Sequence, residues 1–164
     1  MPNLCNLLQN TQIMSESHNS GISLEVKVRT ELKKYYKYEE IQKKKVSIPG
    51  YYTPTGLIKS YEPDHIVPDK IFEDKNDKNK GAPEKLPQAV MKMQLLGEET
   101  GKTPYLIYEG ENYHHYIHND PVMKIAIESS PDVIILSFLE LQKHLFDTMK
   151  PIVREDPIVI DNFL

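Results

Sequence analysis

Residues 61–75, YEPDHIVPDKIFEDK, decide how this chain folds. The stretch predicts two short strands joined by a tight turn, with Asp64 on the first strand and Glu73 and Lys75 on the second. Side chains alternate between the two faces of a strand, so Glu73 and Lys75 are expected to point the same way while Asp74 points the opposite way. The turn would therefore bring Asp64, Glu73 and Lys75 close together.

Two carboxylates and an ammonium on one sheet surface favour a site for a metal ion. Asp64 and Glu73 would repel one another unless a cation joined them. Hard oxygen ligands of this kind suit Mg²⁺, which keeps several waters and usually takes only one or two carboxylates together with a substrate phosphate. We therefore expect Mg²⁺ at Asp64 and Glu73, with Mn²⁺ as a substitute.

The dipeptide Pro63-Asp64 followed by Glu73-Asp74-Lys75 resembles the PD-(D/E)xK nuclease superfamily, which includes many type II restriction endonucleases. The resemblance implies that Asp64 and Glu73 hold the metal. It implies that Lys75 positions or activates the attacking water and offsets charge on the phosphate. It also implies that the backbone carbonyl of Asp74 is a further metal ligand.

Parts of this motif recur elsewhere in the chain. The recurrences are Glu25-Val26-Lys27, Pro68-Asp69 and Pro131-Asp132. The spacing, the strand setting and the order of the neighbouring elements distinguish residues 61–75 from them. The alternative is a solvated, charged hairpin on an unrelated α/β domain.

The resemblance also implies an α/β fold with a mixed sheet and a restriction-endonuclease-like core in the order α-βββ-α-β-β-α. We expect a single domain over residues 1–164, with an N-terminal arm (1–19), the core (20–149) and a C-terminal tail (150–164). The last two strands should be parallel neighbours. The predicted helices cover residues 20–38, 82–97 and 137–149, with a helical turn or two at 121–128, and the other predicted strands cover residues 43–48, 57–61, 103–108 and 132–136.

The helix predicted over residues 20–38 buries an apolar stripe of Leu24, Val28, Leu32 and Tyr35. Glu25 falls at the edge of that stripe. Members of the superfamily often carry a metal-facing acid on this helix, and Glu25 is the candidate here. The alternative is a surface glutamate paired with Arg29 at the i+4 position.

The composition fits one soluble domain. With 164 residues the chain is long enough to bury a single core. A single cysteine, Cys5, excludes an intrachain disulfide and favours a reducing compartment. Neither a run of roughly 18 apolar residues nor a secretory signal is visible, so we expect a cytoplasmic protein without a membrane partner.

The net charge of -4 argues against a surface coated uniformly in positive charge, but the lysines are clustered and leave DNA binding open. The candidates for DNA contacts are Lys78, Lys80, Lys85 and Gln88. For Lys78 and Lys80 the alternative is a solvated loop. For Lys85 and Gln88 the alternative is an ordinary first turn of a helix. Sequence recognition would lie in residues 49–56, 76–82 and 111–120, where Tyr51 and Tyr52 could stack on bases or cap the core.

Three histidines, His114, His115 and His118, lie in a segment predicted as an irregular, histidine-rich surface or a DNA-contacting loop. Zinc needs three or four convergent ligands. His114 and His118 would qualify as a pair only if this segment were helical, and no cysteine is near. We therefore expect no zinc site here.

These observations predict a Mg²⁺-dependent endonuclease that hydrolyses phosphodiester bonds in double-stranded DNA, most simply a type II restriction endonuclease. The small size implies a homodimer that cuts a palindromic site, because twofold symmetry in the protein matches twofold symmetry in the DNA. A repair, junction-resolving or phage-type nuclease of the same superfamily is one alternative. A non-catalytic α/β binding or regulatory domain is the other.

Overall fold

The computed structural model describes residues 23–77 and 83–153. Its helices are α2 (Leu24–Leu32), α3 (Leu86–Thr100), α4 (Glu111–Asn119), α5 (Pro121–Glu128) and α6 (Phe138–Thr148). Its strands are β1 (Val46–Tyr52), β2 (Ile58–Tyr61), β3 (His65–Ile66), β4 (Lys70–Asn76), β5 (Thr103–Glu109) and β6 (Ile134–Ser137). The chain is therefore of the mixed α/β class, as predicted. The predicted arm over residues 1–19 and most of the predicted tail lie outside the described residues.

The main sheet is mixed and has the strand order β3-β4-β5-β6. β3 and β4 form the predicted hairpin, in which His65 pairs with Phe72 and Ile66 pairs with Ile71. β4, β5 and β6 run parallel to one another. The predictions of a central strand over residues 103–108 and of parallel last strands are confirmed.

β1 and β2 form a separate, antiparallel two-stranded sheet. The sequence predicted three successive antiparallel strands, whereas the structure has two successive hairpins, and only the second joins the main sheet. Pro63 lies between the two hairpins and has no N–H to donate, so it cannot continue a ladder of hydrogen bonds.

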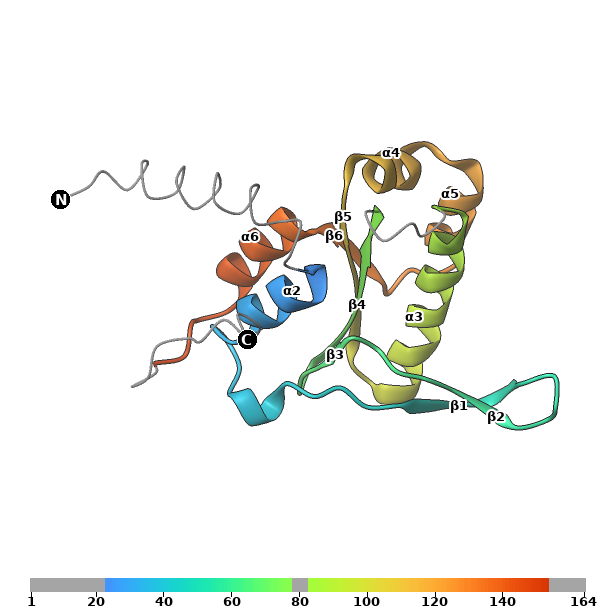
Figure 1. Ribbon diagram of the computed structural model, residues 1–164, viewed down its shortest axis with the longest axis horizontal. Helices are drawn as coiled ribbons and strands as arrows, with labels where there is room; N and C mark the ends of the chain where they lie inside the picture. The colour runs from blue at the N-terminus through green and yellow to red at the C-terminus, as the bar shows by residue number, and fades with distance from the viewer. Residues whose placement is uncertain (1–22, 78–82, 154–164) are drawn as a thin grey trace.

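Helices cover both faces of the main sheet (Figure 1). α2 and α6 lie on one face, where α2 packs on β4 and α6 packs on β5 and β6. α3, α4 and α5 lie on the other face, where α3 packs on β4 and β5. The sheet is thus the middle layer of three, and its two faces have separate hydrophobic clusters.

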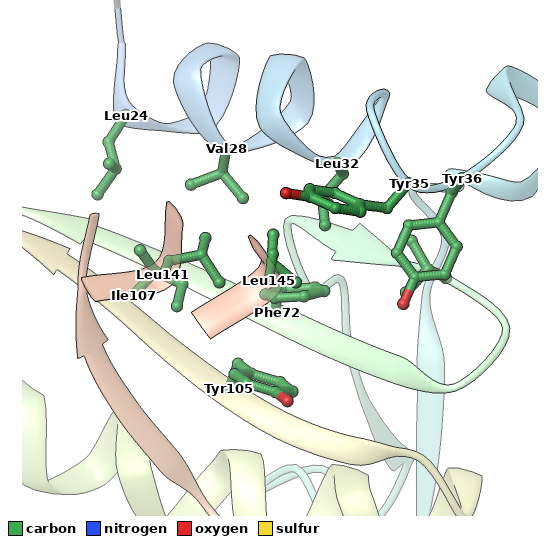
Figure 2. Close-up of a cluster of buried hydrophobic side chains, with 11 residues drawn as sticks. Leu24, Val28, Leu32, Tyr35, Tyr36, Phe72, Tyr105, Ile107, Leu141 and Leu145 are labelled. Atoms are coloured by element: carbon green, nitrogen blue, oxygen red, sulfur yellow. The ribbon is translucent and has the colours of Figure 1, made fainter. Parts of the chain in front are cut away.

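The cluster under α2 and α6 is built from residues far apart in the sequence (Figure 2). Phe72 of β4 lies at its centre, fully buried, with its ring stacked on that of Tyr105 at a centroid distance of 4.9 Å. The other buried members are Leu24, Val28, Leu32, Tyr35, Tyr36, Val67, Ile107, Leu141 and Leu145. The predicted apolar stripe of the first helix is therefore confirmed.

The first helix is shorter than predicted. The prediction covered residues 20–38, but α2 ends at Leu32 and the chain leaves it in turns, in which the N–H of Tyr35 donates to the carbonyl of Leu32. At the other end the hydroxyl of Ser23 accepts from the N–H of Val26, which caps α2. Residues 20–22 lie outside the described part of the chain.

β1 continues through Pro49 to Tyr52, so the prediction that the strand over residues 43–48 ends at Pro49 was wrong. The register shifts between Ser47 and Tyr52, as in a β-bulge, and a bulge tolerates a residue without an N–H. The turn lies instead at residues 53–57, where the N–H of Thr53 donates to the carbonyl of Leu57.

α3 passes through Gly97, where the sequence predicted an end. A Cβ at Gly97 would lie 2.8 Å from Cγ of Pro104, so the absent side chain lets α3 approach β5 closely. Gly101, with a φ of 68°, ends the helix in the left-handed conformation, as predicted. The predicted apolar face of Leu86, Val90, Met93 and Leu96 is buried.

The structure also corrects two predictions near the C-terminal half of the sheet. Residues 111–119 form α4 and not an irregular segment, with Tyr113 and Ile117 one turn apart and buried. Residues 132–136 were predicted as a buried strand, but β6 is the last strand of the sheet and its side chains are half-buried. The helix predicted over residues 121–128 is confirmed as α5, and Ser137 and Glu140 form a capping box at the start of α6.

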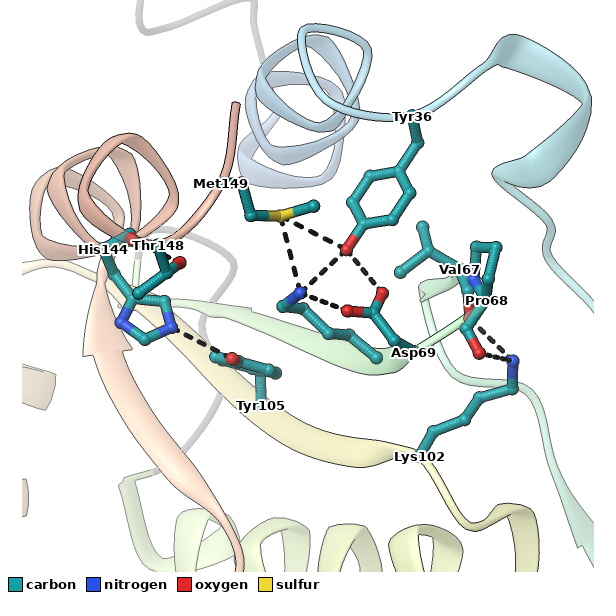
Figure 3. Close-up of polar contacts among 10 residues, drawn as sticks. Tyr36, Val67, Pro68, Asp69, Lys102, Tyr105, His144, Thr148 and Met149 are labelled. Carbon is teal, nitrogen blue, oxygen red and sulfur yellow. Dashed lines mark hydrogen bonds and ion pairs between the residues drawn. The ribbon is translucent and has the colours of Figure 1, made fainter. Parts of the chain in front are cut away.

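A polar network fixes the turn between β3 and β4 (Figure 3). The buried ammonium of Lys70 donates to the hydroxyl of Tyr36 at 2.8 Å and to the carboxylate of Asp69 at 2.7 Å. The Tyr36 hydroxyl itself donates to Asp69 at 2.6 Å. On the other side of the turn, the ammonium of Lys102 donates to the carbonyls of Val67 and Pro68.

Replacing Tyr36 by phenylalanine should destabilise the fold by about 1–3 kcal/mol, because the buried Lys70 ammonium loses a hydrogen-bond acceptor. Urea unfolding of Tyr36→Phe measures this loss. The matched control is Tyr52→Phe, on an exposed ring, which should change the free energy of unfolding by less than about 0.5 kcal/mol. Equal losses in the two variants would contradict the role of the network.

No helix in residues 23–77 or 83–153 has the length and apolar character needed to cross a membrane.

Candidate functional site

The carboxyl groups of Asp64 and Glu73 meet beside the β3–β4 hairpin. Asp64 directly precedes β3, and its carboxyl oxygen accepts a hydrogen bond of 2.7 Å from the backbone N–H of Asp74. Its side chain is also hydrogen-bonded to that of Glu73, which is only 7% exposed. The prediction that the turn brings these two acids together is confirmed.

The two acids share a proton. Burial raises the pKa of Asp64 to about 9, and the hydrogen bond and negative charge of Glu73 add to the rise. Burial also acts to raise the pKa of Glu73, but the hydrogen bond from Asp64 and the charges of Lys92 and Lys75 outweigh it and lower that pKa. At neutral pH the proton therefore resides on Asp64, and Glu73 is the ionised member of the pair.

Two lysines stand beside the pair. Lys75 is half-buried on the face of β4 that carries Glu73, as the alternation predicted, and its charge lowers the pKa of Glu73. The ammonium of Lys92, from α3, lies 3.0 Å from a carboxylate oxygen of Glu73. Lys92 was not a sequence candidate. The signal for it was its position one helical turn after Gln88, on a helix already expected to face the site.

Asp74 faces the opposite side of β4 and pairs with a histidine. Its carboxyl oxygen lies 2.5 Å from Nε2 of His65, and both side chains are almost fully buried. Burial lowers the pKa of His65 to about 3 and raises the pKa of Asp74, so it disfavours the charged form of each group. This pair holds the backbone of Asp74, whose N–H binds Asp64.

Glu25 forms the ion pair with Arg29 that the sequence offered as the alternative to metal binding. Its carboxylate accepts from Arg29 at 3.3 Å and from the ammonium of Lys43 at 2.8 Å. It lies on the face of the sheet that carries Asp74, whose pKa its charge helps to raise. A metal-binding role for Glu25, and for the backbone carbonyl of Asp74, stays a prediction.

Two of the predicted DNA contacts, Lys85 and Gln88, fall at the start of α3. Lys85 ends the 3₁₀ turn Pro83–Lys85, Gln88 lies in the first turn of α3, and both side chains are exposed. Lys78 and Lys80 lie outside the described residues. Gln88 shares α3 with Lys92, and Lys85 directly precedes this helix, so α3 connects the predicted contacts to Glu73.

Because α4 is helical, His114 and His118 lie one turn apart, with ring centroids at 4.4 Å. The Nδ1 atom of His114 is hydrogen-bonded to the hydroxyl of Tyr108 at 2.7 Å. Over residues 23–77 and 83–153, no group of three or more His, Cys, Asp or Glu side chains has the arrangement of a metal site. The helical pair supplies two of the three or four ligands that zinc needs, and the absence of a zinc site stays a prediction.

The raised pKa of Asp64 predicts how the stability of the metal-free protein changes with pH. An acid whose pKa is raised on folding contributes stability that is full below its ordinary pKa of 3.8 and is lost as the pH rises to about 9. In the presence of a chelator the melting temperature should therefore fall between pH 6 and pH 9 in part because of Asp64.

Asp64→Asn keeps a hydrogen-bond donor towards Glu73 but removes this titration. Its melting temperature should be higher than that of the wild type at pH 8 to 9, and the difference should shrink towards pH 5. Thermal unfolding of both proteins over this pH range measures the effect. Parallel curves for the two proteins would show that Asp64 does not carry the proton.

No protein-family model, no curated protein and no solved structure matches this chain.

Proposed function

We propose that this chain is a Mg²⁺-dependent endonuclease that hydrolyses phosphodiester bonds in DNA, in the manner of the PD-(D/E)xK superfamily. The observation that carries the proposal is the pair formed by Asp64 and Glu73, two largely buried acids whose side chains meet beside Lys75 and Lys92. Two carboxyl groups that converge in this way repel one another when both are ionised, and a cation between them would relieve that repulsion.

The residues fit a divalent cation of the magnesium type. Two carboxylates are enough, because Mg²⁺ commonly keeps several waters and completes its shell with substrate phosphate. A cation would take the place of the proton on Asp64 and leave both carboxylates ionised. When bound, such an ion offsets charge on the scissile phosphate and lowers the pKa of a water.

The other side chains have roles in this scheme that follow from their positions. Lys75, on the face of Glu73, stabilises the negative charge that develops at the phosphate. Lys92 holds the carboxylate of Glu73 through its ion pair and restricts its orientation. The N–H of Asp74 orients the carboxyl group of Asp64. Manganese should substitute for magnesium, because both prefer oxygen ligands.

The order of elements also supports the proposal. A helix, antiparallel strands, a second helix and parallel strands follow one another along the chain, which supports the proposal. The expected core order itself stays a prediction, because β1 and β2 stand apart from the main sheet and α4 and α5 lie between β5 and β6. The finer proposal is a homodimeric type II restriction endonuclease that cuts a short palindromic site in double-stranded DNA in the cytoplasm. A nuclease for repair or branched DNA is the nearest alternative.

Incubation of the purified protein with phage or plasmid DNA and Mg²⁺, with and without a chelator, tests the function. Discrete bands that vanish with the chelator would support a site-specific endonuclease. A chelator-sensitive smear, or cleavage of branched DNA alone, would favour the alternative nuclease. No cleavage of plasmid, mismatched or branched DNA would overturn the proposal and favour a non-catalytic domain.

A further inference from the structure

The hairpin arm, defined as residues 46–61 with β1, β2 and their turn, extends away from the main sheet (Figure 1). Its base is anchored, because Ile48 is buried in a cluster with Ile71 and Met93 of β4 and α3. Its outer half is open to solvent. The exposed fractions there are 58% for Tyr52, 68% for Leu57 and 55% for Ile58.

The arm and the segment leading into it are positively charged. Residues 43–61 contain four lysines and no aspartate or glutamate, although the whole chain has a net charge of -4. Lys44 and Lys45 are exposed just before β1, and Lys59 lies on β2. This concentration of positive charge next to exposed aromatic and apolar side chains is complementary to a polyanion with flat, apolar bases.

A row of lysines and tyrosines connects the arm to the candidate site. The ammonium of Lys92, which pairs with Glu73, lies 4.6 Å from the ring centroid of Tyr61. The ammonium of Lys59 lies 5.4 Å from the centroid of Tyr61 and 5.1 Å from that of Tyr51. Lys92 therefore begins, beside Glu73, a row in which lysines and tyrosine rings alternate. The row continues through Tyr61 and Lys59 of β2 to Tyr51 of β1.

We propose that the hairpin arm binds the DNA duplex beside the candidate site, an inference that rests on the proposed nuclease function. The exposed lysines before β1 contact phosphates, and the outer half of the arm enters a groove. A two-stranded β-ribbon fits the major groove of B-DNA, which is about 12 Å wide. The row from Glu73 to Tyr51 sets the path of the duplex, so that DNA held by the arm passes over Asp64 and Glu73.

The competing occupant of the arm is a second copy of this chain. Charge favours DNA, because a second copy has a net negative charge spread over a mixed surface, whereas DNA presents a regular row of phosphates. A dimer contact through the arm would also bury Lys44 and Lys45 away from phosphate. The two occupants respond differently to salt and to protein concentration, and this difference decides between them.

The test compares two double variants of equal charge. Lys44→Gln/Lys45→Gln, called the arm variant, alters the exposed lysines at the base of the arm, just before β1. Lys124→Gln/Lys143→Gln alters exposed lysines of α5 and α6. The affinity for a short labelled duplex is measured by fluorescence anisotropy, in the presence of a chelator and over a range of salt concentrations. The arm variant should lower the slope of log affinity against log salt by about 2, because each lost phosphate contact lowers it by about 1. The control should retain the wild-type slope.

Equal slopes for the wild type and the arm variant, or an equal fall in the control, would overturn the inference. So would sedimentation data in which the arm variant alone loses a dimer. Cleavage of DNA in Mg²⁺ by the wild type is scored separately. If the wild type binds the duplex through the arm but cuts nothing, only the nuclease proposal fails. If it cuts DNA and the arm variant binds as the wild type does, only the arm inference fails.

Discussion

Glu73→Gln is expected to reduce Mg²⁺-dependent cleavage of DNA by about 10²–10³-fold, the usual cost of removing one group that stabilises a charged transition state. The neutral amide keeps the size and shape of the side chain. It cannot neutralise a cation, and it loses the ion pair with Lys92. The pKa of Asp64 should also fall towards its ordinary value, because the negative charge beside it is gone.

Initial rates on a plasmid substrate measure this loss, and circular dichroism verifies that each variant is folded. The matched control is Glu128→Gln, the same change on an exposed side chain of α5, which should leave the rate unchanged. Asp64→Asn should lose activity to a similar degree. Lys75→Met should lose cleavage while Mg²⁺ still raises the melting temperature. Full activity in folded Asp64→Asn and Glu73→Gln would disprove the proposed site.

Phe72→Ala is expected to destabilise the fold by about 3–5 kcal/mol, the largest effect that we expect from any single core substitution. Phe72 is fully buried between the sheet and the helices α2 and α6. The substitution loses the stacked contact with Tyr105 and the T-shaped contact with His65, and it leaves a cavity in a closely packed core.

Urea unfolding of Phe72→Ala gives the loss directly, provided that the slope of free energy against denaturant stays constant. Phe146→Ala is the matched control. The Phe146 ring is 72% exposed on α6, so the same deletion should cost less than about 0.5 kcal/mol. Similar losses in the two variants would mean that Phe72 does not lie at the centre of the core.

The features that the sequence predicted correctly are those set by local pattern. The hairpin around Asp64 and Glu73 follows from two short strands and a turn, and the stripe from Leu24 to Tyr35 follows from helical spacing. The capping box at Ser137 is a local hydrogen-bond motif. Such features depend on a few neighbouring residues, so sequence reasoning can find them without the tertiary structure.

The features that it missed depend on contacts between distant segments. Lys92 reaches Glu73 only because α3 packs across β4. Gly97 lies inside α3, where it does not end the helix but leaves the space that Pro104 of the next strand occupies. β1 continues through Pro49 because a bulge absorbs the missing donor. The histidines of α4 weaken the helical signal, and its burial of Tyr113 and Ile117 against the sheet decides the outcome.

The pairing of α2 with α6 has a consequence for how the chain folds during synthesis. One face of the sheet is covered by helices from opposite ends of the chain, and the N–H of Ile152 donates to the carbonyl of Lys34 to close that layer. Until α6 has left the ribosome, Phe72 and Ile107 lack their packing against Leu141 and Leu145 of that helix. The nascent chain therefore exposes an apolar sheet to chaperones and to other unfinished chains until α6 has been synthesised.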